Sequence, residues 1–251
     1  MIRKLKNKIK EIVDIRFRLL RDQQHQNHQD LLYHHQVLFN HSQLKQLFHE
    51  DSFISFSAWA ISPSTILHVL NDITINNRKY IIELGSGAST FYIAKLLKVL
   101  NSDAIFYTVE SDEKWAKELK RQLQLYDIFD RVNIIIAPLV EVPNNYSFRE
   151  QDTWYDTQVL EDNLTSKEEI DLVLVDGPFG GSTPYARYSA IPFLKSRIAR
   201  EASIFLDDVQ RPDEAEILKE WEKVLKRTSK IHERYGFFTS QRTFDVSPFQ
   251  I

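Results

Sequence analysis

Apolar and polar positions between residues 80 and 227 alternate in a way that predicts strands followed by helices. Short continuous apolar runs, typical of strands buried on both faces, are separated by longer segments in which apolar residues recur at helical spacing. The predicted strands lie near residues 80–84, 104–109, 132–136, 171–175 and 202–206. The predicted helices lie at residues 89–100, 112–125, 184–199 and 213–227. This order indicates an α/β fold, with a Rossmann-like, doubly wound and mostly parallel sheet covered by helices on both faces.

The two ends of the chain depart from this alternation. Residues 1–60 predict an N-terminal helical extension, and residues 61–251 are expected to form the α/β domain. Two extended stretches around Gly236 predict a C-terminal antiparallel hairpin at the edge of the sheet. Residues 138–169 have no clear period, and long irregular loops in compact domains are usually functional or mobile. We therefore expect one α/β domain with additions at both of its ends.

Composition narrows the class of protein without naming a function. At 251 residues, 43% hydrophobic and 27% charged, the chain resembles an ordinary globular protein. Cysteine is absent, which excludes disulfides and thiolate metal sites and fits a cytoplasmic location. No apolar run predicts a membrane-spanning helix or a signal peptide. The net charge of −3 gives no reason to expect nucleic acid as a partner.

The net charge conceals a basic N-terminal segment. Residues 1–21 contain eight Lys or Arg and two acidic residues, a local charge of +6, and their apolar residues recur at near-helical spacing. A basic amphipathic helix can lie on an anionic membrane surface, here the inner face of the membrane. Such a helix can equally pack its apolar stripe on the α/β domain or on a second copy in a homo-oligomer. The sequence leaves these alternatives open.

The junction between the first predicted strand and the first predicted helix of the α/β pattern is the most informative segment. Glu83 lies in the strand, and Gly85-Ser86-Gly87 follows it. Glycines let the backbone turn tightly and approach a ligand, and the next helix offers unpaired N–H groups at its start. Glu110 ends the second strand, 23 residues after Gly87, where a carboxylate can accept hydrogen bonds from ribose hydroxyls. A dinucleotide fingerprint would need a third glycine, so the segment predicts a different nucleotide-type cofactor.

Glu83, the two glycines and Glu110 on successive strands resemble the class I S-adenosylmethionine (SAM)-dependent methyltransferases over roughly residues 60–251. The resemblance implies that Glu83 and the glycine turn hold the methionine end of SAM, and that Glu110 holds the ribose. It places the adenine after the third strand, where the usual polar residue is missing. The implied cofactor-binding residues are Glu83, Gly85, Ser86, Gly87, Ser89, Thr90, Glu110, Ala137, Pro138 and Asp176.

Acidic residues also end the fourth and fifth predicted strands, at Asp176 and at Asp207-Asp208. Three carboxylates that converge at one edge of a sheet repel each other, and Mg²⁺ or Mn²⁺ would relieve the repulsion. Such an ion can orient a hydroxyl group and lower its pKa, while Asp176 accepts the proton. The alternative is that Asp207 and Asp208 only cap and solvate the end of a strand.

These acids look like those of the metal-dependent O-methyltransferases, and most closely like the sugar O-methyltransferases of the macrocin and aminocoumarin-sugar type. The resemblance implies Asp176, Asp207 and Asp208 as metal ligands. The chain departs from that family where Pro178 follows Asp176-Gly177 in place of a second Asp.

Two further features bear on the acceptor. Arg187 is the second candidate catalytic residue, since a guanidinium can bind an anionic sugar or a phosphate, although it can equally pair with a nearby acid. The Trp154-Tyr155 pair either stacks on a sugar ring or belongs to the core.

We predict that the chain transfers a methyl group from SAM to a hydroxyl of a saccharide or glycoconjugate, with the help of a divalent metal. The acceptor is then a small molecule or a glycan, including a polysaccharide. The alternatives are a metal-independent N- or phenol O-methyltransferase, an aminopropyltransferase-like enzyme, and a non-catalytic module that only binds the nucleotide.

Overall fold

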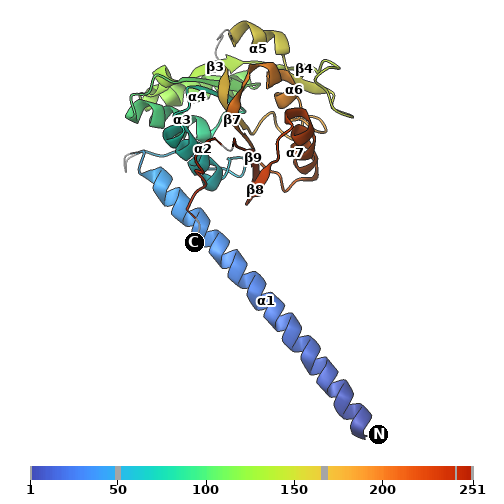
Figure 1. Cartoon of the computed structure of the whole chain (residues 1–251). Coiled ribbons are helices and arrows are strands. Elements are labelled where there is room, and N and C mark those ends of the chain that lie inside the picture. The colour runs from blue at the N-terminus through green and yellow to red at the C-terminus, as the bar shows by residue number, and fades with distance from the viewer. Residues whose placement is uncertain (1, 49–51, 165–168, 241, 250–251) are drawn as a thin grey trace.

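The computed structural model describes residues 2–48, 52–164, 169–240 and 242–249. A seven-stranded sheet in the order β3-β2-β1-β6-β7-β9-β8 forms the centre of the fold (Figure 1). The strands are β1 (Tyr80–Leu84), β2 (Ile105–Glu110), β3 (Asn133–Ile136), β6 (Ile170–Val175), β7 (Ile198–Leu206), β8 (Lys230–His232) and β9 (Tyr235–Phe238). The first five are parallel, whereas β9 and β8 are antiparallel. The expected Rossmann-like fold with a C-terminal antiparallel hairpin is thus confirmed.

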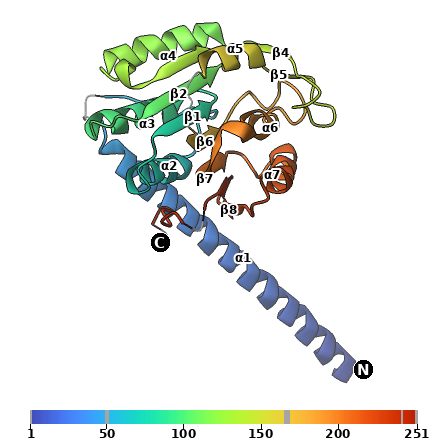
Figure 2. The same cartoon turned by 45° about the horizontal axis from the view of Figure 1, so that its top comes forward.

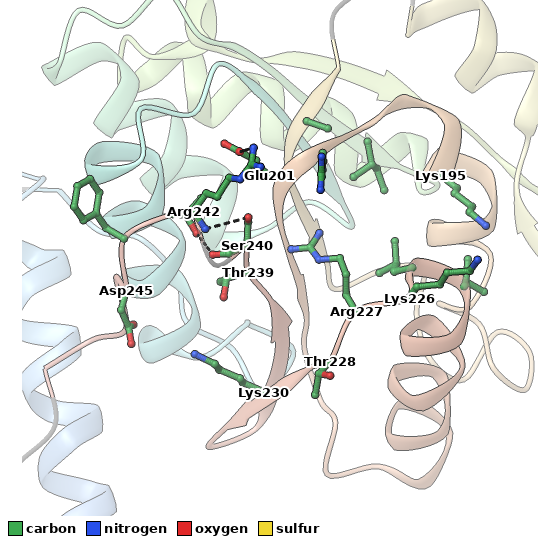
Figure 3. A pocket seen from close by; sticks show the side chains of 17 residues that line it. Lys195, Glu201, Lys226, Arg227, Thr228, Lys230, Thr239, Ser240, Arg242 and Asp245 are labelled. Carbon is green, nitrogen blue, oxygen red and sulfur yellow. Dashed lines mark hydrogen bonds and ion pairs between the residues drawn. The ribbon is translucent and has the colours of Figure 1, made fainter.

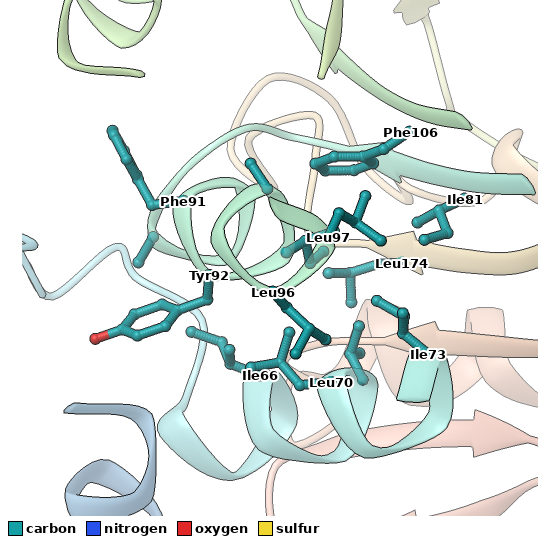
Figure 4. Packing of buried hydrophobic residues seen from close by; sticks show 14 of the residues in the cluster. Ile66, Leu70, Ile73, Ile81, Phe91, Tyr92, Leu96, Leu97, Phe106 and Leu174 are labelled. Carbon is teal, nitrogen blue, oxygen red and sulfur yellow. The ribbon is translucent and has the colours of Figure 1, made fainter. Parts of the chain in front are cut away.

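Helices cover both faces of this sheet (Figure 2). They are α2 (Pro63–Ile75), α3 (Ala88–Val99), α4 (Glu113–Leu125), α5 (Thr157–Asn163), α6 (Ala190–Leu194) and α7 (Pro212–Leu225). Successive strand residues point to opposite faces, so that Leu174 belongs to one buried cluster and Val175 to the other. Figure 4 shows the first cluster, in which Leu174 and Ile81 of the sheet lie near Ile73 of α2 and Leu97 of α3. This two-sided burial explains why the strands are continuous apolar runs.

Helix α1 (Ile2–Lys45) extends away from the sheet and meets the rest of the fold only near its C-terminal end (Figures 1 and 2). Asn40 is fully buried there and donates to Ser64 Oγ at 2.7 Å, and Leu44 is buried beside it. Residues 10–31 are exposed on all sides of the helix. In the described part of the chain, no helix is both long and apolar enough to cross a membrane.

Two local expectations from the sequence differ from the structure. The helix expected at residues 184–199 is only α6 plus a 3-10 turn at Lys195–Arg197, because residues 180–189 form turns that bring Arg187 to the sheet edge. Of the segment 138–169, expected to be irregular, the described residues 138–164 contain β4 (Leu139–Glu141) and β5 (Thr153–Tyr155), which form an antiparallel ribbon before α5, while residues 165–168 lie outside the described part. Gly236 itself lies inside β9, where a Cβ would lie 2.5 Å from the Leu218 side chain of α7.

Candidate active site

The loops that follow β1 and β6 touch each other at two glycines. Gly85 has φ +91°, and a Cβ at this residue would lie 2.6 Å from the backbone nitrogen of Gly177. A Cβ at Gly177 would lie 2.5 Å from the Tyr155 hydroxyl. The N–H groups of Asp176 and Gly177 both donate to the Leu84 carbonyl, at 2.9 and 2.7 Å. The glycine turn foreseen at Gly85 therefore depends on a second glycine, Gly177, whose contact role the sequence did not reveal.

Glu110 lies at the end of β2 and faces the same opening. Its Oε2 accepts a hydrogen bond from Ser86 Oγ at 2.6 Å, and its Oε1 accepts from the backbone N–H groups of Ser111 and Asp112 at 2.7 and 2.8 Å. The Ala137 N–H donates to the Glu110 carbonyl at 2.9 Å, which ties the end of β3 to this position. The carboxylate is thus oriented before any ligand binds.

Glu83 and its neighbours lie beneath the glycine turn. Glu83 is fully buried and accepts hydrogen bonds from the hydroxyls of Thr90, at 2.5 Å, and Thr108, at 2.6 Å. Burial raises the pKa of Glu83 to about 7, although neighbouring hydroxyl groups partly oppose this rise. Ser89 is also buried, and the Gly87 N–H donates to Thr90 Oγ1 at 3.0 Å. These side chains support the turn from below and do not reach the surface of the opening.

The opening is a cleft of about 350 Å³ at the carboxyl ends of β1, β2, β6 and β7. Its lining includes Gly85, Ser86, Glu110, Tyr155, Asp176, Gly177, Arg187, Asp208, Arg211 and Arg234. Of the candidate adenine neighbours, Ala137 is buried and Pro138 is exposed beyond the lining. Ligands of open α/β sheets bind at this end of the strands, so the cleft is the candidate active site.

The three aspartates after β6 and β7 meet at the edge of this cleft, where Asp176 and Asp208 line it and Asp207 is fully buried. One carboxylate oxygen from each of Asp176, Asp207 and Asp208 lies within 4.8 Å of the others. Burial raises the pKa of Asp176 well above its ordinary value, and the neighbouring aspartates raise it further while Arg187 opposes them. Burial likewise raises the pKa of Asp207 to about 6, against the effect of Arg234. Asp176 therefore holds a proton more strongly than an exposed aspartate does.

Three arginines lie among these aspartates. Arg187 Nη2 is 3.1 Å from Asp176 Oδ1 and 3.4 Å from Asp208 Oδ2, and its Nη1 donates to the Asp207 carbonyl at 3.0 Å. Arg211 lies 2.9 Å from Asp208, and Arg234 lies 2.7 Å from Asp207 and also contacts Asp208. Arg187 and Arg211 also lie 3.9 and 4.0 Å from the buried Glu214, so the three guanidiniums offset the charge of four neighbouring carboxyl groups. The sequence left open whether Arg187 binds an anionic acceptor or pairs with a nearby acid. In the structure it pairs with Asp176 and Asp208.

A divalent ion fits this arrangement poorly. The oxygens are of the kind that Mg²⁺ prefers, but such an ion needs them at about 2.0–2.1 Å in near-octahedral geometry. Arg187 Nη2 already lies between Asp176 and Asp208, and Arg234 lies against Asp207. A cation bridging the triad would compete with both guanidiniums for the same oxygens. The metal site expected from the sequence therefore does not fit the observed positions of Arg187 and Arg234.

Two aromatic side chains that the sequence did not single out stand at the rim of the cleft. Trp59 is 71% exposed and Phe179 is 57% exposed, and their ring centroids are 5.2 Å apart in an edge-to-face arrangement. Trp154, in contrast, is fully buried and belongs to the core, while Tyr155 is buried and reaches the cleft floor. The two exposed rings come from loops about 120 residues apart, so no local sequence pattern could predict that they meet.

Arg234 was also missed. It lies in the turn between β8 and β9, and its carbonyl accepts a hydrogen bond from the Val209 N–H at 2.8 Å. The pairing of β9 with β7 brings this turn to the aspartates. The sequence predicts a hairpin at the edge of the sheet but not its register against β7. Without that register, the contact of Arg234 with the aspartates could not be predicted.

Comparison with known proteins supports the assignment of the fold. No protein-family model and no curated protein sequence matches the chain. Among solved structures, an O-methyltransferase from Bacillus cereus in complex with SAH is similar with a TM-score of 0.53 and 15% identity, over 73% of this chain and 84% of that one. The O-methyltransferase TomG from Streptomyces achromogenes, involved in tomaymycin synthesis and bound to SAM, has a TM-score of 0.51 and 13% identity, over 80% and 88% of the two chains. Precorrin-6y C5,15-methyltransferase from Geobacter metallireducens has a TM-score of 0.52 and 12% identity, over 76% and 95%.

The chain therefore has the fold of the class I SAM-dependent methyltransferases. At these levels of identity the similarity concerns the fold, and the chemistry has to be argued from the cleft itself.

Proposed function

We propose that this chain is a SAM-dependent O-methyltransferase that methylates a hydroxyl group of a saccharide or glycoconjugate. The observation that carries the proposal is the cleft, in which the glycine turn and Glu110 lie next to Asp176 of the neighbouring strand. The glycine turn and Glu110 are the kind of groups that hold a nucleotide at the carboxyl ends of parallel strands. Asp176, a carboxyl group with a raised pKa in the same cleft, is the candidate that acts on the acceptor.

The residues of the cleft fit SAM. A Cβ at Gly87 would meet no atom within 4 Å, so the backbone there is open to a ligand. Glu110 can exchange its hydrogen bond from Ser86 Oγ for ribose hydroxyls, and the Ala137–Pro138 corner would lie beside the adenine. SAM supplies an electrophilic methyl group on a sulfonium. The protein has to hold that group in line with the acceptor oxygen, and positioning of this kind contributes about 7–11 kcal/mol to catalysis.

Asp176 is the proposed proton acceptor. Burial raises the pKa of Asp176, which makes its carboxylate a stronger base than an exposed aspartate, and the contact with Arg187 fixes this carboxylate at the cleft. When the hydroxyl oxygen attacks the methyl group, its proton passes to Asp176. General-base assistance of this kind contributes about 10²–10⁴-fold.

The exposed Trp59–Phe179 pair supports a saccharide acceptor. An apolar surface rimmed by polar groups marks a ligand groove, and the C–H face of a sugar ring can pack on an aromatic ring while its hydroxyls point to polar side chains. Arg211, 48% exposed beside this pair, can hydrogen-bond to such hydroxyls. We derive no step through a metal ion, because the arginines compete for its ligands.

An acceptor screen tests this function. Purified protein with SAM is offered saccharides, phenols, amines and diamines, and release of S-adenosylhomocysteine and a mass gain of one methyl group are measured. Methylation of a saccharide hydroxyl is the expected result. Methylation of only amines or phenols, aminopropyl transfer, or SAM binding without turnover would each replace the proposal by one of its rivals.

We also propose that residues 1–21 hold the enzyme at an anionic membrane surface. Phe17, Leu19 and Leu20 are 67%, 62% and 56% exposed on α1, in a segment of charge +6. Self-association would bring two such charges together, whereas each Lys or Arg near an anionic surface contributes about 1 kcal/mol of attraction. Charge complementarity thus favours lipid over a second copy.

Co-sedimentation with vesicles of phosphatidylcholine, with and without phosphatidylglycerol, tests the contact. Binding should require phosphatidylglycerol and fall in the double variant Leu19→Ser, Leu20→Ser, while Leu38→Ser on the same helix changes it little. A stable dimer that binds neither vesicle would assign the helix to a homo-oligomer instead.

A further inference from the structure

A second opening lies at the opposite end of the sheet from the cleft. It is a cavity of about 1010 Å³ between the start of β7, the end of α7 and the segment that follows β9 (Figure 3). Ligand sites in proteins are about 300–1,000 Å³, so the cavity can hold a molecule much larger than a single ion. None of the residues proposed for methyl transfer lines it.

The cavity is strongly basic. Six of its 17 lining residues are Lys or Arg, and two are acidic. The basic residues are Lys195, Arg200, Lys226, Arg227, Lys230 and Arg242. Both acids have partners: Glu201 pairs with Arg242 at 3.2 Å, and Asp245 accepts two hydrogen bonds from Ser247, which lower its pKa, as does the positive charge of Lys230. The other five basic residues form no ion pair with any residue that the structure describes.

Arg227 lies in the middle of this set (Figure 3). It is partly buried, and its Nη2 donates to the Ala202 carbonyl at 2.7 Å. Burial lowers the pKa of Arg227, and the positive charge of Arg78 lowers it further. A guanidinium that is partly removed from water without a carboxylate partner is costly, and a bound anion would offset that cost.

The cations stand on both sides of the cavity. Lys195 and Lys226 lie on the side of the helices, while Lys230 and Arg242 lie on the side of the hairpin and the C-terminal segment (Figure 3). One phosphate is too small to contact both sides of a cavity of this size. A ligand with separated negative groups can reach both.

We propose that this cavity binds a ligand that carries two or more phosphate groups. Guanidinium groups match phosphate oxygens in pairs, and lysines add point charges that tolerate several phosphate positions. The hydroxyls of Thr228, Thr239 and Ser240 supply neutral donors. Leu225, on the side of α7, and Phe244, on the side of the C-terminal segment, offer apolar contacts to the rest of the ligand. A soluble phosphorylated compound and a phosphorylated lipid headgroup share this chemistry.

Titration calorimetry of the full-length protein with inorganic tripolyphosphate, without SAM, tests the site. The double variant Lys195→Gln, Lys230→Gln removes two exposed cations of the cavity. The matched control Lys219→Gln, Lys223→Gln removes the same charge from exposed positions of α7 outside it. We expect the cavity variant to lose about tenfold in affinity or more, and the control to change by less than about twofold. Arg227→Gln should lose at least as much as the cavity variant.

Vesicles of phosphatidylcholine with and without a phosphorylated phosphoinositide distinguish the two sources of phosphate. Tripolyphosphate binding that the cavity variant weakens supports a soluble ligand. Binding to phosphoinositide vesicles alone, weakened by the cavity variant and not by its control, supports the same site with a lipid headgroup. No saturable binding of either probe by the wild-type chain, or equal losses in both double variants, would overturn the proposal. None of these outcomes depends on methyl transfer.

Discussion

The two openings at the ends of the sheet both contain several cations but differ in how those cations are balanced. In the cleft, Arg187, Arg211 and Arg234 lie 3.1, 2.9 and 2.7 Å from aspartate oxygens. In the cavity, Arg227 and four more basic residues have no such partner within the described part of the chain. The cleft is thus an internally paired, preorganised site that suits a reaction, whereas the cavity carries an excess of positive charge that suits an anion. The balance of charge, more than the residue types present, distinguishes the two.

The largest expected effect comes from breaking a pair in the cleft. Arg187→Met leaves Asp176 and Asp208 partly buried without this partner, and removal of one member of a buried pair costs about 3–5 kcal/mol. Lys230→Gln in the cavity should change the free energy of unfolding by no more than about 0.5 kcal/mol in either direction. Urea denaturation measures both. Equal effects of the two substitutions would remove the contrast between the openings.

A smaller loss is expected at the floor of the cleft. Gly177→Ala places a methyl group 2.5 Å from the Tyr155 hydroxyl and should lower the free energy of unfolding by about 3 kcal/mol. Gly87→Ala meets no atom within 4 Å, so it should cost less than about 1 kcal/mol and instead weaken SAM binding. Denaturation and calorimetry of both variants check this. A well-tolerated Gly177→Ala would show that the two loops are not in the contact described.

The buried acid under the cleft predicts a dependence on pH. Burial raises the pKa of Glu83 from its ordinary value of 4.5 to about 7, so between these pH values the folded state holds a proton that the unfolded state has lost. The contribution of Glu83 to stability is therefore greatest at low pH and is lost as the pH rises through about 7. Between pH 5 and 8, the free energy of unfolding of the wild type should fall by roughly 2–3 kcal/mol more than that of the Glu83→Gln variant. Parallel curves for the two proteins over this range would contradict the raised pKa.

The smallest expected effect is that of chelation. If the arginines complete the charge balance of the cleft, EDTA should change the rate of methyl transfer by less than about twofold, and added Mg²⁺ or Mn²⁺ should not increase it. A loss of activity on chelation that either ion restores would mean that the ion displaces Arg187, and would restore the metal site expected from the sequence.

The parts that the sequence predicts well are those that depend on neighbours along the chain. The continuous apolar runs located the five parallel strands. The ends of these strands in turn identified Glu110, Asp176 and Asp208 as candidate site residues, and all three line one cleft. Parallel strands present these ends at one edge, so a strand boundary is enough to place them.

The parts that it could not predict depend on tertiary contacts. Arg234 reaches the aspartates through the hairpin, Gly177 is required because another loop passes against it, and Trp59 meets Phe179 from a distant loop. The metal was inferred from acids alone, because the pattern that gathers carboxylates says nothing about arginines brought in from other segments.

The most direct test of the methyltransferase assignment is the rate of S-adenosylhomocysteine release from SAM with an accepted saccharide, compared between the wild type and Asp176→Asn. The account predicts steady turnover by the wild type, a loss of about 10²–10⁴-fold in the variant, and SAM affinities that differ by less than about threefold. Equal rates for the two proteins would contradict the role of Asp176. A wild-type chain that fails to bind SAM would contradict the assignment of the cleft.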